Sequence, residues 1–192
     1  MRLRGSVLAL LFAGALGVGP TGLAQDDSDV VIRTESLGDG LHVLYGRGGN
    51  IMASSGADGL LMVDDQYAPL ARKIRAALDA FQEGPVRLLV NTHWHGDHVG
   101  GNEVFGRAGA IIMAHENVWE RMATGRDAGA GRPVPPAPAA ALPVVTHRHG
   151  LTMRWNDQTI ELVPTHPAHT DGDTLVHFLE ADVIHMGDVY NG

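Results

Sequence analysis

Four potential metal ligands lie within six consecutive residues near the middle of this chain: His93, His95, Asp97 and His98. They follow an apolar run, residues 86–90, that is typical of a short buried strand. In extended backbone, side chains two positions apart point to the same side, as do His93 and His95. Gly96 then lets the chain turn, so that the next carboxylate and imidazole face the same space. The spacing supplies ligands for two adjacent cations and favours metal binding over a chance histidine cluster on a surface loop.

Further residues of the same chemical types lie downstream, where later apolar segments end. His169 and Thr170 come soon after residues 159–163, and Asp188 follows residues 182–185. Both segments read as strands, and side chains at strand ends can converge on a common edge of a fold. A second set of ligands from distant segments is what a zinc site needs.

Short strands and a few helices must position these ligands. Glycine turns separate apolar segments at residues 30–34, 41–45, 50–54 and 60–63, which predicts a meander of strands. Apolar spacing predicts helices at residues 67–81 and 115–122, and strands at residues 86–90, 110–114, 144–147, 151–155, 159–163, 174–179 and 182–185. The Gly-, Pro- and Ala-rich stretch 125–143 reads as a loop. This order predicts a layered α+β arrangement of two sheets with helices outside.

The first 24 residues are typical of a secretory signal peptide. Arg2 and Arg4 precede an apolar run over residues 7–18, and small residues end the segment before Gln25. We therefore expect residues 1–24 to be a signal peptide and residues 25–192 one domain, exported to a bacterial periplasm or secreted. A retained membrane anchor or a buried helix is the alternative. The chain has no cysteine, so any metal must be held by His, Asp or Glu.

Charge and composition exclude several classes of partner. The chain has 192 residues, 44% of them hydrophobic and 19% charged, which suits one globular domain. Its formal net charge is -8, whereas nucleic-acid and anionic-membrane surfaces need a basic face. We expect a small-molecule substrate, no nucleic-acid partner and no stable membrane insertion after signal cleavage. The oligomeric state is left open.

The order of these residues resembles the motif series of the metallo-β-lactamase superfamily. The series runs His93-x-His95-x-Asp97-His98, then His169-Thr170, then Gly187-Asp188. Asp64, after the apolar segment 60–63, matches the aspartate that ends an earlier strand in that family. The resemblance covers nearly all of the chain after residue 24. It implies a four-layer αβ/βα sandwich of the α+β class, with two metals at one edge.

The resemblance also implies roles for individual residues. His93, His95 and His169 would bind the first metal, and Asp97 and His98 the second. Asp188 would bridge the two metals or serve the second alone. The residues expected to support these ligands through hydrogen bonds are Asp64 and, with less support, Thr92, Thr170 and Asp171. Asp97, beside the attacking water, would also accept or hand on its proton and so act in catalysis.

One departure from the family pattern concerns the C-terminus. The pattern ends with one more metal-binding histidine after a further strand and helix, whereas this sequence stops at Gly192, four residues past Asp188. We expect a C-terminally truncated fragment, with the C-terminal strands and helix of the sandwich missing. A natural minimal form is the alternative.

The resemblance implies a zinc-dependent hydrolase, and the N-terminal segment predicts that it is exported. A metal-bound hydroxide would attack an ester, lactone, thioester or amide-type bond, with two zinc ions in the full-length protein and iron or manganese also compatible. The sequence has no cysteine and no Gly-x-Ser-x-Gly elbow, which agrees with a reaction that needs no protein nucleophile. Three alternatives stay open: a β-lactamase proper, an iron-dependent sulfur dioxygenase, and a metal-binding but catalytically silent fragment.

Overall fold

The computed structural model describes residues 27–127 and 133–190 of the chain. The expected signal peptide, residues 1–24, lies outside the described residues, as do residues 128–132 of the expected loop. None of the described helices is long and apolar enough to cross a membrane.

Seven strands form the larger of two main sheets, in the order β1-β2-β3-β4-β5-β6-β9. Neighbours from β1 to β4 run antiparallel, and β4, β5, β6 and β9 run parallel. The carboxyl ends of the parallel strands therefore meet at one edge of the sheet. The bounds are Arg33–Gly38 (β1), Leu41–Tyr45 (β2), Ile51–Ser54 (β3), Leu60–Val63 (β4), Val86–Val90 (β5), Ile111–His115 (β6) and Val145–His147 (β9).

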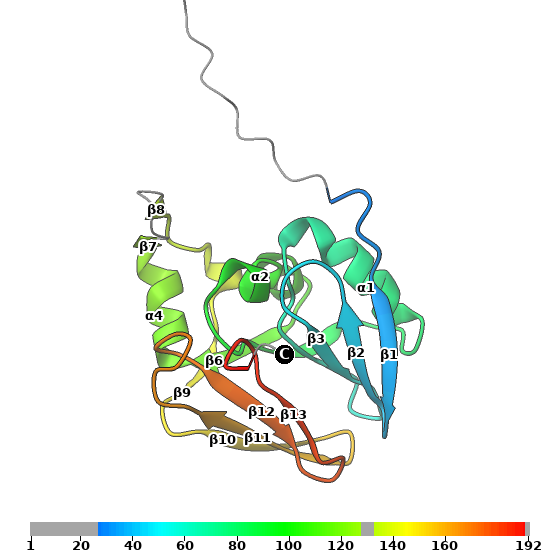
Figure 1. Ribbon diagram of the computed structural model, residues 1–192. Helices are drawn as coiled ribbons and strands as arrows, with labels where there is room; N and C mark the ends of the chain where they lie inside the picture. The colour runs from blue at the N-terminus through cyan, green and yellow to red at the C-terminus, as the bar shows by residue number, and fades with distance from the viewer. Residues whose placement is uncertain (1–26, 128–132, 191–192) are drawn as a thin grey trace, which may run out of the picture.

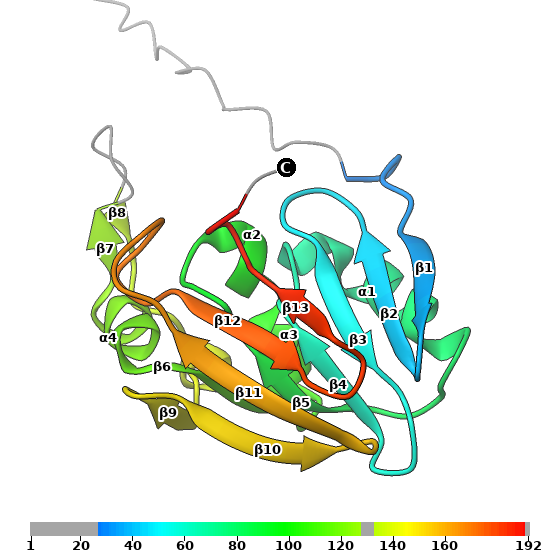
Figure 2. The same ribbon diagram turned by 60° about the horizontal axis from the view of Figure 1, so that its bottom comes forward.

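The smaller sheet has four antiparallel strands in sequence order and packs against one face of the larger sheet (Figures 1 and 2). Its strands are Leu151–Trp155 (β10), Gln158–Pro164 (β11), Thr174–Phe178 (β12) and Val183–His185 (β13). The loop after β11 and the end of β13 reach the edge where the parallel strands of the larger sheet end (Figure 2).

The helices cover the other face of the larger sheet (Figure 1). They are the 3-10 turn Ala68–Leu70 (η1), Ala71–Asp79 (α1), Gly96–Val99 (α2), Asn102–Arg107 (α3), Glu116–Thr124 (α4) and the 3-10 turn Ala139–Ala141 (η2). A two-stranded ribbon, Arg126–Asp127 (β7) and Pro133–Val134 (β8), extends beyond α4. Within the described residues, no helix covers the outer face of the smaller sheet. The mixed α+β class predicted from the sequence is confirmed.

Strands in the middle of the molecule are apolar on both faces because each face is covered. In β3, Ile51 packs towards the helices, together with Ile74 of α1, and Met52 packs towards the smaller sheet, together with Phe178 of β12. All four residues of β3 and of β4 are buried. Two apolar clusters, one on each side of the larger sheet, therefore hold the three layers together.

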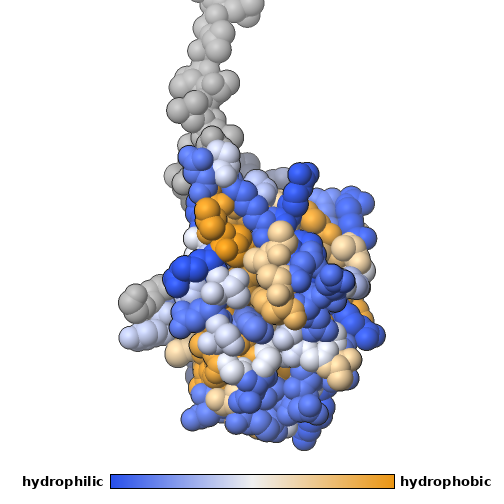
Figure 3. Space-filling view, turned by 90° about the vertical axis from the view of Figure 1, so that its right-hand side faces the viewer, coloured by the Kyte–Doolittle hydropathy of each residue, from blue (hydrophilic) through white to orange (hydrophobic). Residues whose placement is uncertain are grey.

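The structure corrects the predicted position of the first strand. Residues 30–34 were expected to form it, but β1 begins at Arg33, and Val30 and Ile32 pack against the helix-side core. The strand is exposed along its whole length, so its pairing with β2 is a matter of backbone hydrogen bonds, and hydrophobic patterning misplaces it. The side of the molecule that carries this edge is mainly hydrophilic, with separate hydrophobic patches (Figure 3).

Two further boundaries differ from the prediction. The helix expected over residues 67–81 consists of η1 followed by α1, which ends at Asp79. The loop expected over residues 125–143 contains β7, β8 and η2, and its Ala141 is buried against the helix layer. The alanines of η2 have no period that could show this packing in advance.

Asn156, in the turn between β10 and β11, joins the two sheets at a place away from the edge where the parallel strands of the larger sheet end. Its amide donates to Ser54 Oγ (3.0 Å) and to the Gly59 carbonyl (2.9 Å), and its Oδ1 accepts from the Asp58 amide (2.9 Å). The side chain is buried, and its backbone has a φ of 50°. Its hydrogen bonds thus connect the smaller sheet to the end of β3 and to the turn between β3 and β4.

We predict that Asn156→Ala lowers the free energy of unfolding by about 3 kcal/mol, because it removes three buried hydrogen bonds and leaves their partners unpaired. Asp157→Ala is the matched control, since Asp157 is exposed and has a φ of 60°. That control should cost only about 1 kcal/mol, from the left-handed backbone alone. Urea unfolding of both variants measures the difference, and equal losses would contradict the role given to the Asn156 side chain.

Candidate metal centre

Two groups of potential metal ligands lie side by side at the edge where the parallel strands end. The ligand atoms of the first group, His93, His95, His169 and Asp188, all lie within 4.8 Å of one another. The same limit holds for the second group, Asp97, His98 and Asp188. Asp188 belongs to both groups, so the six residues predicted as metal ligands form one continuous cluster.

Three segments that are far apart in the sequence build the first group. His93 and His95 follow β5, His169 lies in the loop between β11 and β12, and Asp188 follows β13. His95 Nδ1 and His169 Nε2 are 2.8 Å apart, and His169 Nε2 is 3.5 Å from Asp188 Oδ2. These nitrogens and the carboxylate oxygen therefore face a common point.

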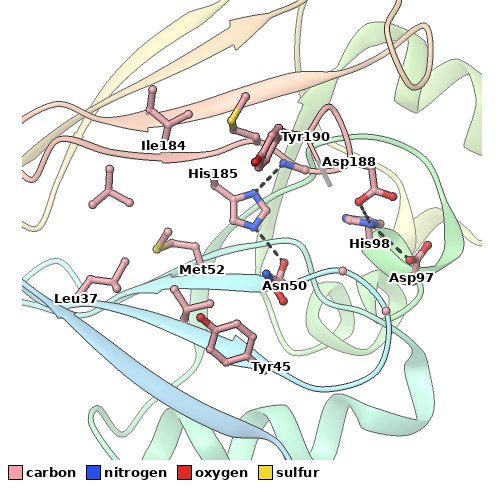
Figure 4. Close-up of a pocket in the computed structure, with 16 residues that line it drawn as sticks. Leu37, Tyr45, Asn50, Met52, Asp97, His98, Ile184, His185, Asp188 and Tyr190 are labelled. Atoms are coloured by element: carbon pink, nitrogen blue, oxygen red, sulfur yellow. Dashed lines mark hydrogen bonds and ion pairs between the residues drawn. The ribbon is translucent and has the colours of Figure 1, made fainter. Parts of the chain in front are cut away.

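The second group lies at the start of α2 and uses the other oxygen of the shared carboxylate. His98 Nε2 is 3.1 Å from Asp188 Oδ1 and 3.6 Å from Asp97 Oδ2. Figure 4 shows the His98 ring between these two carboxylates. Since Oδ1 faces one group and Oδ2 the other, Asp188 is placed to bridge two cations, one of the two arrangements expected from the sequence.

Unpartnered nitrogens show that the cluster fits a cation. His93 Nε2 and His98 Nε2 are buried, and neither makes a hydrogen bond to the described part of the chain. The carboxylates near His98 Nε2 are close enough for an ion pair but do not meet hydrogen-bond geometry. Leaving a buried polar atom without a partner costs about 1–3 kcal/mol. Imidazole nitrogens and carboxylate oxygens are the donor set that zinc takes in proteins, so the residues fit such an ion.

Asp64, at the carboxyl end of β4, supports the loop that carries these histidines from behind. It is fully buried and has a φ of 61°. Its Oδ1 accepts from the Thr92 amide (2.8 Å), and its Oδ2 accepts from Thr92 Oγ1 and from His98 Nδ1 (2.7 Å each). The expectation that Asp64 holds the histidine loop through hydrogen bonds agrees with these contacts.

The contacts of Asp64 also fix which nitrogen of each ring is free. Thr92 gives its hydroxyl proton to Asp64, so His93 Nδ1, 3.1 Å from Thr92 Oγ1, must be the donor in that contact. His98 Nδ1 likewise donates to Asp64. Both rings are therefore oriented with Nε2 towards the cluster, as a histidine ligand requires.

Burial and neighbouring charges move the pKa values of these two histidines in opposite directions. Burial and, to a smaller extent, the neighbouring His98 lower the pKa of His93 to about 4. For His98, burial also acts downwards, but the carboxylates of Asp64, Asp188 and Asp97 together raise its pKa to about 9. In the metal-free site, His98 is thus protonated at neutral pH, and a cation must displace its proton to bind there.

The remaining supporting residues predicted from the sequence lie around the turn that carries His169. Thr170 donates from its Oγ1 to Asp173 Oδ1 at 2.5 Å and accepts from the Gly172 amide (3.2 Å). Asp173 was missed in the sequence analysis, yet its Oδ2 accepts from the amides of His169 and Thr170 (2.8 Å each). The pattern Thr-x-x-Asp is a capping signal that could have indicated it. Asp171 accepts hydrogen bonds from Trp94, in the loop that follows β5, and from Arg121 of α4.

Gly49, in the turn between β2 and β3, was also missed. A Cβ atom at this position would lie 2.2 Å from His98 Cε1 and 2.5 Å from its Nε2. The turn therefore packs directly against the face of the His98 ring, and only a residue without a side chain fits there.

A cavity of about 680 Å³ adjoins the second group (Figure 4). Asp97, His98 and Asp188 line one end, and Tyr45, Met52 and Ile184 are among the residues farther in. Its volume lies in the range of small-molecule sites.

The model of the metallo-beta-lactamase superfamily matches residues 25–189 of the chain. The chain belongs to this superfamily. A curated relative, the 2,4-dinitroanisole O-demethylase subunit alpha of Nocardioides sp. (strain JS1661), is 30% identical over 146 residues, which cover 73% of this chain and 41% of the relative. The hydroxyacylglutathione hydrolase of Erythrobacter litoralis (strain HTCC2594) is 29% identical over 99 residues, or 51% of this chain and 32% of the relative. The chain thus spans less than half the length of these relatives.

Solved metallo-beta-lactamases share the fold. The class B3 di-zinc enzyme from an Alaskan soil metagenome superposes with a TM-score of 0.69 at 20% identity, covering 81% of this chain and 60% of that one. The subclass B3 enzyme of Bradyrhizobium japonicum gives a TM-score of 0.67 at 20% identity with the same coverage of both chains. The predicted fold family is confirmed.

For Asp64→Asn we predict a 10–100-fold lower zinc affinity, the usual cost of losing a group that orients metal ligands. The amide would direct an N–H towards donors on Thr92 or His98. Asp65→Asn is the control, because burial raises the pKa of the neighbouring Asp65 well above its usual value. The side-chain amide of Asn can still accept from the Gly101 backbone amide, as Asp65 Oδ1 does at 2.8 Å, so this change should leave the affinity nearly unchanged. Competition with a chromophoric chelator measures both, and equal effects would contradict the role of Asp64.

We predict that Gly49→Ala displaces the His98 ring, weakening zinc binding and lowering the free energy of unfolding by about 1–3 kcal/mol, the usual cost of overpacking. Gly96→Ala is the control, since it lies between two ligands but a Cβ there meets no atom within 4 Å. The control should bind zinc normally. The same chelator competition and urea unfolding test this, and normal zinc binding by Gly49→Ala would be inconsistent with the contact.

Proposed function

We propose that this protein is an exported zinc-dependent hydrolase. The observation that carries the proposal is the convergence of two ligand groups on one shared carboxylate, Asp188, at the edge of the stacked sheets. The spacing and donor types suit two zinc ions, the number present in the class B3 di-zinc relative. Iron or manganese at the same residues is the variant that metal analysis distinguishes.

Zinc, when bound, lowers the pKa of a coordinated water to about 7 and polarises the bond under attack. The residues of the chain supply the rest. His93, His95 and His169 would hold the first ion, Asp97 and His98 would hold the second, and Asp188, which belongs to both ligand groups, would serve both. Because these side chains come from several rigid strand ends, they keep the two ions in fixed positions relative to a substrate.

Asp97 is the residue that we assign to proton transfer. Its side chain is 29% exposed, whereas the neighbouring His98 is 1% exposed. A carboxylate at the open end of the cluster can accept a proton from an attacking water and hand it to the leaving group. This arrangement does not require a nucleophilic side chain.

The substrate class that we favour is a small ester, lactone, thioester or amide-type compound. One curated relative is named a hydroxyacylglutathione hydrolase, and another an O-demethylase subunit. The likeness to β-lactamases rests on structures of 20% identity and concerns the fold. Export, with residues 1–24 as the signal peptide and residues 25–192 as one domain, completes the proposal.

His169→Ala, compared with His166→Ala, tests the proposal. His166 lies three residues away in the same loop, is exposed and belongs to neither ligand group. In a panel of esters, lactones, thioesters and β-lactams, we expect His169→Ala to reduce zinc-dependent hydrolysis by at least about 100-fold, since a lost ligand disrupts the geometry of the ions. His166→Ala should behave like the natural protein.

Metal removal gives the second part of the test. A chelator should abolish hydrolysis, and added zinc should restore it. Hydrolysis that survives chelation would overturn the proposal, as would purified protein that carries stoichiometric iron and no zinc.

A further inference from the structure

The three histidines of the first ligand group lie on two loops that belong to different sheets. One loop follows β5 and carries His93 and His95, and the other joins β11 to β12 and carries His169. A backbone hydrogen bond from Thr174 to Thr92 (2.9 Å) links the two segments at their base. Nearer the ligands, the links between the loops are made by side chains.

Asp171 connects both loops to helix α4. Its Oδ1 accepts from the Trp94 indole Nε1 at 3.0 Å, and its Oδ2 accepts from Arg121 Nε and Nη2 at 3.1 and 2.6 Å. Its backbone carbonyl accepts from Asn117 Nδ2 at 2.6 Å. The loop between β11 and β12 accordingly lies against α4 in both ribbon views (Figures 1 and 2).

The contact with Trp94 reaches the metal ligands directly. Trp94 stands between His93 and His95 in the sequence, and its ring packs edge-on against the His95 ring, with centroids 4.4 Å apart. Asp171 is two residues from His169. One carboxylate thus fixes both the indole that packs against His95 and the turn that carries His169. The facing ring nitrogens, His95 Nδ1 and His169 Nε2, are 2.8 Å apart.

Little space is left for this loop to move towards α4. A Cβ atom at Gly172 would lie 2.9 Å from Val118 Cγ2 and 3.3 Å from the Val118 backbone nitrogen. The loop is therefore seated on the first turn of α4, and the ion pair with Arg121 holds it from the side. Val118 of α4 packs with Ala114 of β6 in one apolar cluster. The loop is therefore held in a fixed position relative to the core of the larger sheet.

We infer that Asp171 is a positioning residue that sets the distance between His95 and His169, and thereby the affinity of the first ligand group for zinc. This inference rests on the proposed function. Asp171 does not itself belong to either ligand group. Its loss should therefore weaken the ion at His93, His95, His169 and Asp188 more than the ion at Asp97, His98 and Asp188.

Zinc and cobalt(II) titrations of the metal-free protein, without any substrate, test the inference. We expect Asp171→Ala to lower the affinity for the first ion by 10–100-fold, the range found for residues that orient metal ligands. Asp171→Asn keeps one acceptor and loses either the Trp94 or the Arg121 contact, so its effect should be smaller. The visible spectrum of the cobalt protein reports whether the geometry of the first site has changed.

Glu116→Gln is the matched control. Like Asp171, Glu116 pairs with an arginine, Arg148, and its ion pair also involves α4, but its partner lies outside both ligand loops. It should leave both affinities unchanged. If Asp171→Ala fails to fold, Trp94→Phe and Arg121→Gln each remove one of the two contacts and should still weaken the first ion.

The outcomes separate the inference from the proposed function. Absence of zinc binding by the natural protein would overturn the proposed function. Zinc binding by the natural protein, with unchanged affinity for the first ion in Asp171→Ala or an equal loss in Glu116→Gln, would overturn the inference about Asp171 alone.

Discussion

The buried carboxylate of Asp64 is the interaction on which the site depends. Removing a carboxylate from water costs several kcal/mol unless donors surround it, and here three hydrogen bonds from Thr92 and His98 do so. The donors reach it because β4 and β5 are parallel, with Val63 beside Val90, which places their carboxyl ends together. The site therefore depends on the crossover connection through α1, which makes β4 and β5 parallel. The carboxylate then fixes the loop on which the ligands stand.

The hydrogen bonds around Asp64 use one nitrogen of the His93 and His98 rings and leave the other nitrogen of each ring without a hydrogen bond in the described part of the chain. The Nδ1 atoms of His93 and His98 are occupied on the side of Thr92 and Asp64, so both Nε2 atoms face the cluster and neither makes a hydrogen bond within the described residues. The buried His93 Nε2 costs about 1–3 kcal/mol because it has no partner among these residues, and the repulsion between the carboxylates of Asp97 and Asp188 is offset in the metal-free site by the protonated His98. A cation at the cluster would give His93 Nε2 a partner and take the place of the His98 proton. The proposed binding site thus holds buried polar groups that destabilise the metal-free fold. Such unfavourable groups are usually found at functional sites.

The sequence was informative where chemistry and secondary structure coincide. An apolar strand followed directly by Asp64, or after Asn91 and Thr92 by His93, indicates a side chain delivered to a sheet edge, and the structure brings the predicted ligands together there. Other features have no local signature. The contact of Trp94 with Asp171 joins residues 77 positions apart, and the fit of Gly49 against His98 depends on the packing of a turn. The position of β1 was missed because an exposed edge strand has no hydrophobic pattern to locate it.

The smaller sheet contributes the ligands that the larger sheet cannot supply, so the spacing between the sheets decides whether a site exists. Thr92 helps to set that spacing. Its carbonyl accepts from the Thr174 amide of β12, and its side chain lies against Gly187, where a Cβ would be 2.7 Å from Thr92 Oγ1. Gly187 has a φ of 53° and directs the chain to Asp188. One residue of the histidine loop thus contacts the buried carboxylate on one side and, on the other, strand β12 and the segment that follows β13. The ligands from the two sheets are consequently brought together by protein contacts, and a cation adds a further cross-link between sheets that already meet.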